Sequence, residues 1–422
     1  MPLYVMNAER YIVDQLIPYI GNKRKLTSLI RAAIEATGVR EGTFYDAFAG
    51  STVVSRLAKA LGYRVIANDW EPYSYYIGLA YIRNNRPPEF RALGGIHNAI
   101  NTLNRLEPVR GYIARHYCPE DDERYDPDSE RMFYTQENGR RIDAIRERIA
   151  SWKASGTICD DEEAALLAPL IFQAAYCSNT SGVFKGFHRG WGGATKTAWY
   201  RIRSALTLAP PVFWDNSREN LVYKGDANSL LDEVECDIAY LDPPYNQHQY
   251  GANYHLLNTV ALWDKPQIGP RFEARHADNG KSAIRKDWRT ERRSLYCYRD
   301  SAQAAFSRLV GGIKARFMLV SYSTDGIIPF DDLLGILADR GELSVVTQRY
   351  KRYRVSSQRP SPKSHNVEFV AIVDTGRAAD GSNIQKVKQQ VYAEHINTME
   401  EPKTGSENLK VIGGNQCPDF AE

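Results

Sequence analysis

The chain has 422 residues, 43% of them hydrophobic and 25% charged, a composition typical of soluble globular proteins. This length suffices for one large domain plus a sizeable insertion or second domain. No apolar run approaches the roughly 20 residues of a membrane span and no signal peptide begins the sequence, so a cytoplasmic protein is expected. The net charge of +3 is too small to indicate a nucleic-acid partner by itself.

The cysteines are widely spaced and form no C-x-x-C pair, so neither a zinc site nor a disulfide framework is expected. They are Cys118, Cys159, Cys177, Cys236, Cys297 and Cys417. We expect reduced thiols and no metal.

The first informative segment is a glycine and a cluster of cations before an amphipathic helix predicted over residues 28–34. Gly21, Lys23 and Tyr19 lie in this segment. Taken alone, the cluster is also consistent with a solvated helix cap.

Residues 43–69 predict a strand, a tight turn at Gly50, a helix that ends at Gly62, and a second strand that ends in Asp69. An acid about 20 residues beyond such a turn is placed to bind ribose hydroxyls, although it could also only cap the next helix. The turn lacks a G-x-G-x-x-G pattern, which suits a cofactor without a pyrophosphate.

From about residue 84 to residue 220 the alternation of strands and helices stops. Apolar stripes predict helices over Arg140–Trp152 and Asp160–Tyr176, so this region is interpreted as a mostly helical insertion. The insertion contains a loop, residues 180–193, with five glycines, three aromatic residues, and Lys185 and Arg189. We favour DNA contact by these two cations over a purely structural glycine-rich turn.

The sheet pattern resumes with a strand that ends at Asp226, followed by an apolar strand that runs directly into Asp242, Pro243, Pro244 and Tyr245. The two prolines remove N–H donors and leave backbone carbonyls as unpaired acceptors. A carboxylate, a free carbonyl and an aromatic face at the carboxyl edge of a sheet suit a planar group that bears an NH2, such as a nucleobase amine.

Two later segments are rich in cations. Residues 265–299 hold ten Lys or Arg and four acids, with aromatic residues between them, which favours a loop that grips the DNA backbone over a merely solvated face. Residues 349–354 alternate cations and rings, which is consistent either with phosphate contact or with protection of a strand edge. The candidates in these segments are Arg285, Lys286, Arg292, Arg293, Lys351 and Arg352.

The remaining pattern predicts a helix over 302–313, a buried strand over 317–322, and two closing strands over 343–347 and 368–373. Residues 376–422 are polar and predict a surface helix and a flexible tail.

The motif Asp242 to Tyr245, with its continuation through Tyr250 and residues 253–257, resembles the Dam-like, α-class S-adenosylmethionine-dependent DNA adenine-N6 methyltransferases. Aspartate in the first position favours adenine, because the cytosine-N4 enzymes usually have serine there. The resemblance extends over most of residues 18–373, including the Tyr19, Gly21, Lys23 motif, in which Asn22 stands where many members have glycine.

The resemblance implies an α/β, Rossmann-like methyltransferase sheet with helices on both faces. It divides the chain into a catalytic domain (1–83 and 221–375), an inserted helical target-recognition region (84–220) and a C-terminal helix and tail (376–422). It also implies that Asp46, Phe48 and Gly50 line the methionine side of the cofactor, with Asp46 paired to its amino group. Asp226 is expected to accept from the adenine amine of S-adenosylmethionine, and Asp242 to lie beside that cofactor.

The predicted reaction is methyl transfer to a flipped adenine in double-stranded DNA, with Asp242, Pro243 and Tyr245 as the catalytic residues. The alternatives are an enzyme that acts on cytosine N4 or RNA adenine, and a catalytically inert DNA-binding relative. Further expectations are a monomer or weak dimer, and either a companion restriction endonuclease or an enzyme that acts alone in a phage or host.

Overall fold

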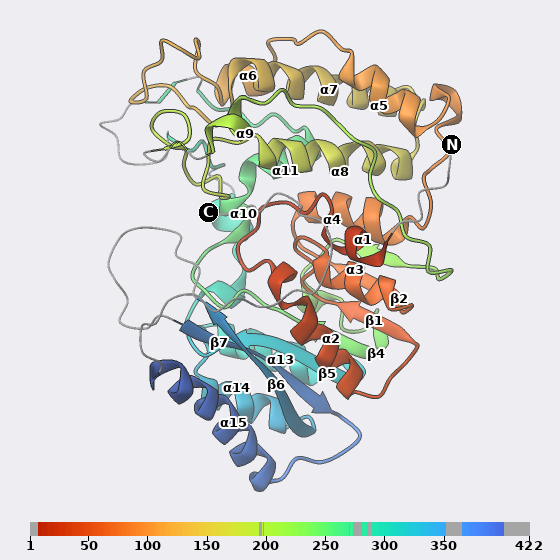
Figure 1. Ribbon diagram of the computed structural model, residues 1–422, viewed down its shortest axis with the longest axis vertical. Coiled ribbons are helices and arrows are strands. Elements are labelled where there is room, and N and C mark those ends of the chain that lie inside the picture. Colours follow the sequence, from red (N-terminus) through yellow and green to blue (C-terminus); the bar gives the residue numbers. More distant parts are fainter. Residues whose placement is uncertain are drawn as a thin grey trace.

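The computed structural model describes residues 7–193, 196, 198–269, 271–272, 281–285, 288–351 and 365–400. Its centre is a seven-stranded sheet with the order β3-β2-β1-β4-β5-β7-β6 (Figure 1). The strands are β1 (Thr43–Asp46), β2 (Arg64–Asn68), β3 (Leu221–Tyr223), β4 (Glu235–Leu241), β5 (Lys314–Ser323), β6 (Glu342–Lys351) and β7 (His365–Asp374).

Strands β1 to β5 pair in parallel, and β7 pairs antiparallel with both β5 and β6. Strand β1 lies between β2 and β4, so the order of connection reverses at the junction of β1 and β4. In open α/β sheets the crevice at the carboxyl ends of the strands on either side of such a reversal is where ligands bind. The predicted α/β fold with a Rossmann-like sheet is confirmed.

Helices cover both faces of the sheet because β1, β2, β4 and β5 carry apolar side chains on both sides, as buried parallel strands do. One face packs against α1 (Ala8–Val13), α2 (Thr27–Ala36) and α3 (Val53–Ala60). The other packs against α13 (Ala302–Gly312), α14 (Phe330–Ala338) and α15 (Gly381–Glu400). The predicted helix in the C-terminal region corresponds to α15, whereas α14 was not predicted.

A helical layer lies above the sheet domain in Figure 1 and has a hydrophobic core of its own. Its helices from the insertion are α5 (Ile96–Asn104), α6 (Tyr112–His116), α7 (Gln136–Ala154), α8 (Asp160–Tyr176) and α9 (Trp199–Arg203). The predicted helix over Asp160–Tyr176 has the observed bounds of α8, and the predicted stripe residues Ile142, Ile145 and Ile149 are buried in α7.

The core of this layer extends beyond residues 84–220. It also takes in side chains of α4 (Pro72–Gly78) and of α11 (His255–Leu262), which follows the short helix α10 (Tyr250–Asn253). The segment after the turn at Asp242 to Tyr245 therefore joins the two parts of the molecule.

The described cysteines Cys118, Cys159, Cys177, Cys236 and Cys297 carry free thiols. Within the described ranges, no helix has the length and apolar character needed to cross a membrane, and no group of three or more His, Cys, Asp or Glu side chains could hold a metal ion.

Candidate active site

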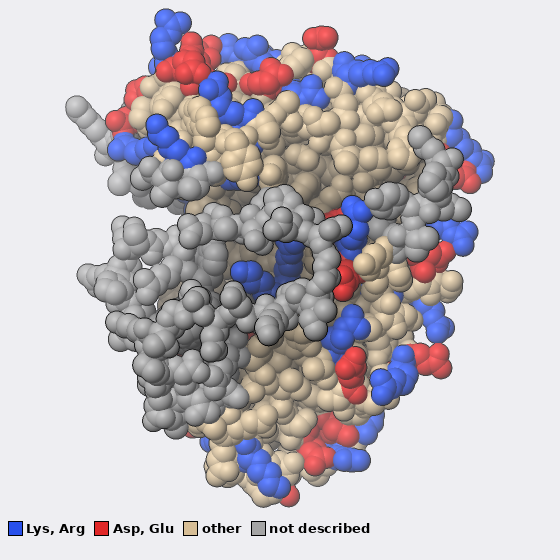
Figure 2. Space-filling view, viewed as in Figure 1, with Lys and Arg blue, Asp and Glu red and all other residues tan. Residues whose placement is uncertain are grey.

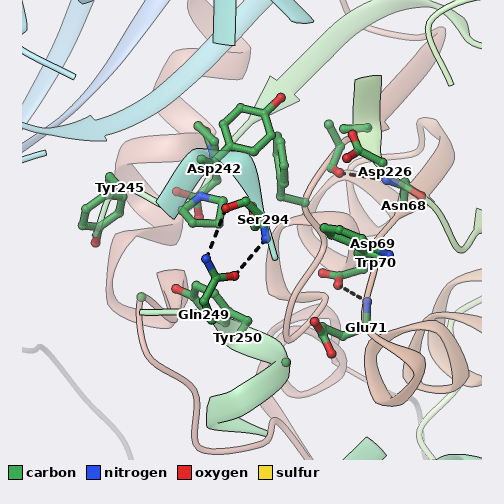
Figure 3. A pocket seen from close by; sticks show the side chains of 18 of the residues that line it. Asn68, Asp69, Trp70, Glu71, Asp226, Asp242, Tyr245, Gln249, Tyr250 and Ser294 are labelled. Carbon is green, nitrogen blue, oxygen red and sulfur yellow. Dashed lines mark hydrogen bonds between the residues drawn. The ribbon is translucent and has the colours of Figure 1, made fainter. Parts of the chain in front are cut away.

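A pocket opens at the carboxyl edge of the sheet, where β1 and β4 adjoin, and most of the predicted site residues line it (Figure 3). They come from five separate parts of the chain: the loop before α2, the ends of β1, β2 and β3, and the turn after β4. The predicted residues in the wall are Tyr19, Gly21, Lys23, Phe48, Asp69, Asp226, Asp242, Pro243 and Tyr245.

Two predicted residues lie behind this wall. Asp46, at the end of β1, is 1% exposed and accepts a 2.6 Å hydrogen bond from the Ser55 hydroxyl. Burial raises the pKa of Asp46 to about 7. Gly50 has φ +50°, and a Cβ added there would lie 2.8 Å from Cε1 of Tyr19. Both residues therefore support the pocket from beneath.

The buried Lys23 forms an ion pair with Asp242, which is 17% exposed, with 3.0 Å between Nζ and Oδ1. Burial lowers the pKa of Lys23, but Asp242 and neighbouring tyrosines outweigh it and raise the pKa well above its ordinary value. Burial raises the pKa of Asp242, and the Lys23 cation opposes that rise. Burial also raises the pKa of Glu368, on β7, while the Lys23 cation opposes that rise and Asp242 adds to it.

Aromatic packing fixes the loop that carries Tyr19. The Tyr19 ring stacks on Tyr254 with 4.9 Å between centroids and lies 5.3 Å from the Tyr250 ring. The Ile20 N–H donates to the Tyr254 hydroxyl (2.8 Å), and the Tyr250 hydroxyl donates to the Ile20 carbonyl (3.3 Å). The N-terminal loop is thereby fastened to α10 and to Tyr254, directly before α11.

Asp69 uses both carboxylate oxygens to shape the wall. Oδ2 accepts from the Gly50 N–H (2.7 Å) and Oδ1 from the Glu71 N–H (2.8 Å), which joins the turn after β1 to the start of α4. Asp226 accepts from the Asn228 N–H (2.8 Å) and faces the same pocket.

Several lining residues were not among the predicted site residues: Trp70, Glu71, Gln249, Ser294 and Tyr296. Arg292 also lines the pocket, although it was predicted as a DNA-binding residue. Gln249 and Ser294 exchange two hydrogen bonds, 3.2 Å from the Gln249 amide to the Ser294 carbonyl and 2.8 Å from the Ser294 N–H to the Gln249 side chain (Figure 3). The Phe48 and Tyr296 rings pack edge to face, with 5.3 Å between their centroids. Arg292 and Tyr296 belong to the segment 265–299, which is rich in cations and aromatic residues. From the sequence, that segment was predicted to contact DNA and not to line the pocket.

The predicted DNA-binding cations are dispersed. Lys185 and Arg189 are exposed in the glycine-rich loop, and Arg189 pairs with Asp128. Arg285 pairs with Asp264 and stacks on Trp288, and Arg293 contacts the Tyr298 hydroxyl (2.5 Å). Arg292 lines the pocket. Lys286 and Arg352 lie outside the described residues, as does the side chain of Lys351.

The profile of the D12 class of N6 adenine-specific DNA methyltransferases matches residues 19–286. The chain belongs to this family. The matched range contains most of the lining residues described above, from Tyr19 to Gly251, and all of the Asp242 to Tyr245 turn.

Several curated proteins are similar to most of the chain. The type II methyltransferase M.NlaIII of Neisseria lactamica is 32% identical over 84% of this chain and 98% of its own length. The type II methyltransferase M.FokI of Planomicrobium okeanokoites is 32% identical over 89% of this chain but only 56% of its own length. The type II methyltransferase M.CviAII of Paramecium bursaria Chlorella virus 1 is 30% identical over 80% of this chain and 93% of its own length. No solved structure matched significantly.

As a member of the D12 class, the protein is a DNA methyltransferase that acts on the N6 amine of adenine. The family implies S-adenosylmethionine as the methyl donor. The predicted family, reaction and enzyme class are therefore confirmed.

Proposed function

We propose that Asp242 and the Pro243 carbonyl accept the two hydrogens of the amine of a flipped adenine. The observation that carries this proposal is the place of Asp242, which lies in one pocket with Phe48, Asp69 and Asp226. An exocyclic amine is a poor nucleophile because its lone pair is delocalised into the ring. Two acceptors on its hydrogens favour a pyramidal nitrogen whose lone pair is free to attack.

Lys23 holds the Asp242 carboxylate in its ionised form. A buried carboxylate would otherwise bind a proton and lose its value as an acceptor. The ion pair opposes that change and also fixes the side chain, since Lys23 is only 4% exposed. The ionised Asp242 then stabilises the positive charge that develops on the adenine nitrogen as the bond forms.

Tyr245 supplies a ring on which the flipped base can stack. Its ring packs against Tyr322 with 5.7 Å between centroids, and its carbonyl accepts from the Ile327 N–H (3.1 Å). The turn is thus held by the loop between β5 and α14. Base flipping costs a few kcal/mol, and stacking on an aromatic side chain returns on the order of 1–3 kcal/mol.

The donor chemistry of the pocket fits a nucleoside cofactor. Aromatic walls from Phe48, Trp70 and Tyr296 suit a purine, and Asp226 can accept from its amine. Asp69 keeps lone pairs for ribose hydroxyls after its two backbone hydrogen bonds. When bound, S-adenosylmethionine supplies an electrophilic methyl group on a sulfonium. The roles assigned to Tyr19 and Gly21 are to close this pocket, while Asp46 and Gly50 support it from beneath.

We propose that Lys185, Arg189 and Arg293 contact double-stranded DNA from the loops around the pocket. Figure 2 shows Lys or Arg side chains at the floor of a hollow between the helical layer and the sheet domain. The glycine-rich loop is anchored close to the catalytic turn, because the Phe184 N–H donates to the Asn253 carbonyl (2.7 Å) and His255 Nε2 lies 2.9 Å from the Phe184 carbonyl. In this proposal the helical layer around residues 84–220 recognises the target sequence.

The biological role that we propose is the modification of DNA beside a companion restriction endonuclease. The support is that several curated relatives carry the names of type II methyltransferases or modification methylases. Methylation without such a companion is the second candidate. We propose a cytoplasmic location, with which the fold and the absence of a spanning helix among the described residues are consistent. We also propose a monomer or weak dimer that needs no metal.

The proposal is tested by incubating the protein with labelled S-adenosylmethionine and duplex DNA, and by identifying the labelled nucleoside after digestion. We expect N6-methyladenine with the wild type and none with Asp242→Ala, while DNA affinity stays within about tenfold because Asp242 acts on the reacting amine. Turnover retained by Asp242→Ala would refute the assigned role. Label in N4-methylcytosine or in RNA would indicate the alternative acceptors, and tight DNA binding without transfer an inert relative.

A further inference from the structure

One part of the pocket contains a buried carboxylate and a guanidinium cation that have no role in the chemistry proposed above. Glu71, at the start of α4, and Arg292, from the segment after the catalytic turn, both line the pocket. Glu71 is 7% exposed. In Figure 3 its carboxylate lies below Asp69 and Trp70 and on the far side of the pocket from Asp242.

Asn258 fixes the Glu71 carboxylate. Asn258 is fully buried in α11, and its amide orientation is set because Oδ1 accepts from the Tyr73 N–H (3.1 Å). Its Nδ2 then donates to Glu71 Oε2 (2.5 Å). The other carboxylate oxygen, Oε1, accepts no hydrogen bond from any residue that the structure describes, so it can receive a donor from a ligand.

Arg292 and Glu71 form a loose ion pair without a hydrogen bond. Nη1 of Arg292 lies 3.8 Å from Glu71 Oε2, which is beyond hydrogen-bond distance. This nitrogen is buried and has no hydrogen-bond partner within the described part of the chain. The guanidinium is held in place by Trp288, whose ring centre lies 4.9 Å from Cζ. A buried guanidinium nitrogen without a partner is costly unless a ligand supplies an acceptor.

A carboxylate and a guanidinium that both have unused hydrogen-bonding capacity complement a zwitterion. The amino-acid end of S-adenosylmethionine is such a group, and Asp46, the acid expected to pair with its amino group, lies behind the wall at 1% exposure. We propose that Glu71 binds the α-ammonium group and Arg292 the α-carboxylate of the cofactor. This inference rests on the proposed function of the pocket as the cofactor site. It also makes the segment that carries Arg292 part of that site.

Two ligands that differ only in this end test the inference. S-adenosylhomocysteine keeps the amino-acid group, and 5′-methylthioadenosine lacks it but keeps the ribose and adenine. We measure the affinity of each by calorimetry for the wild type, Glu71→Gln and Arg292→Gln. Each substitution should weaken S-adenosylhomocysteine by about tenfold or more, the usual value of a hydrogen bond between charged groups, and should leave 5′-methylthioadenosine unchanged.

Asp226→Asn is the matched control, since a contact with the adenine amine should affect both ligands equally. Equal weakening of both ligands by Glu71→Gln would overturn the inference and indicate a role in ribose binding or in folding, and so would affinities that do not change. Thermal unfolding of each variant shows whether the fold is kept. If the wild type binds neither ligand, the cofactor site itself is wrong and the proposed function of the pocket fails with it.

Discussion

The Lys23 ammonium lies 3.0 Å from the Asp242 carboxylate, so a loop near the N-terminus and the turn after β4 meet in one ion pair. Because Lys23 is 4% exposed, solvent screens this attraction little. The loop is also fastened to α10 and α11 through Tyr250 and Tyr254. The protonation state of the proposed catalytic acid therefore depends on how the N-terminal loop is seated.

Replacing Lys23 by Met should raise the pKa of Asp242, because burial raises that pKa and the lysine opposes the rise. The reaction requires the ionised carboxylate, so the acidic limb of the kcat/KM profile should move to higher pH and activity should partly recover in alkaline buffer. The measurement is kcat/KM against pH. Lys25→Met, at an exposed position of the same turn, is the control and should leave the profile in place. A loss of activity that is equal at every pH would contradict this explanation.

Gly50→Ala should weaken cofactor binding more than it destabilises the fold. Gly50 has φ +50° and an added Cβ would come within 2.8 Å of the Tyr19 ring, so the pocket wall must shift. Gly38→Ala is the matched control, since Gly38 has φ +73° with nothing within 4 Å of an added Cβ. Both variants should lose about 1–2 kcal/mol of unfolding free energy from backbone strain. Only Gly50→Ala should reduce S-adenosylhomocysteine affinity in calorimetry; equal affinities would argue against a role of this contact.

Lys185→Ala should reduce the salt dependence of DNA binding. If the exposed lysine neutralises one phosphate, the slope of log K against log salt should become shallower by about 1. Arg189 pairs with Asp128, so Arg189→Ala should have a smaller effect unless DNA breaks that pair. Fluorescence anisotropy over a range of salt concentrations measures both slopes. Slopes identical to that of the wild type would place the loop away from the DNA backbone.

The sequence was sufficient for the parts of the fold that local patterns encode. Helix α8 begins with an acidic first turn after Cys159 and continues as one uninterrupted, mostly apolar stretch to Tyr176. Its bounds were therefore predictable from the sequence. Residues next to strand ends, such as Asp69 and Asp242, were predictable site candidates because parallel strands bring their carboxyl ends to one edge.

The features that were missed depend on contacts between distant segments. Glu71 reads as an ordinary residue near a helix start, and only its contacts with Asn258 and Arg292 place it in the pocket. The depth of a motif residue was also not predictable, since Asp46 follows the pattern but lies behind the wall and bonds to Ser55. Helix α14 packs against the sheet, but its apolar sequence is short and lies just before β6. The sequence pattern therefore did not predict it as a separate helix.

The affinity for S-adenosylhomocysteine should fall as pH decreases through about 7. Burial raises the pKa of Glu71 to about 7, with Arg292 and Asn258 opposing and Asp69 adding to the rise. Protonation below that pH removes the charge that we assign to binding the α-ammonium, whereas the ionised form above it binds well. Arg292→Gln removes an opposing cation and should move the transition to higher pH. Asp46 also has a pKa of about 7, so Asp46→Asn is the control. Calorimetry from pH 6 to 8 measures how the affinity for S-adenosylhomocysteine changes. If the pH dependence disappears in Asp46→Asn but persists in Glu71→Gln, the titrating acid is Asp46 and this prediction is wrong.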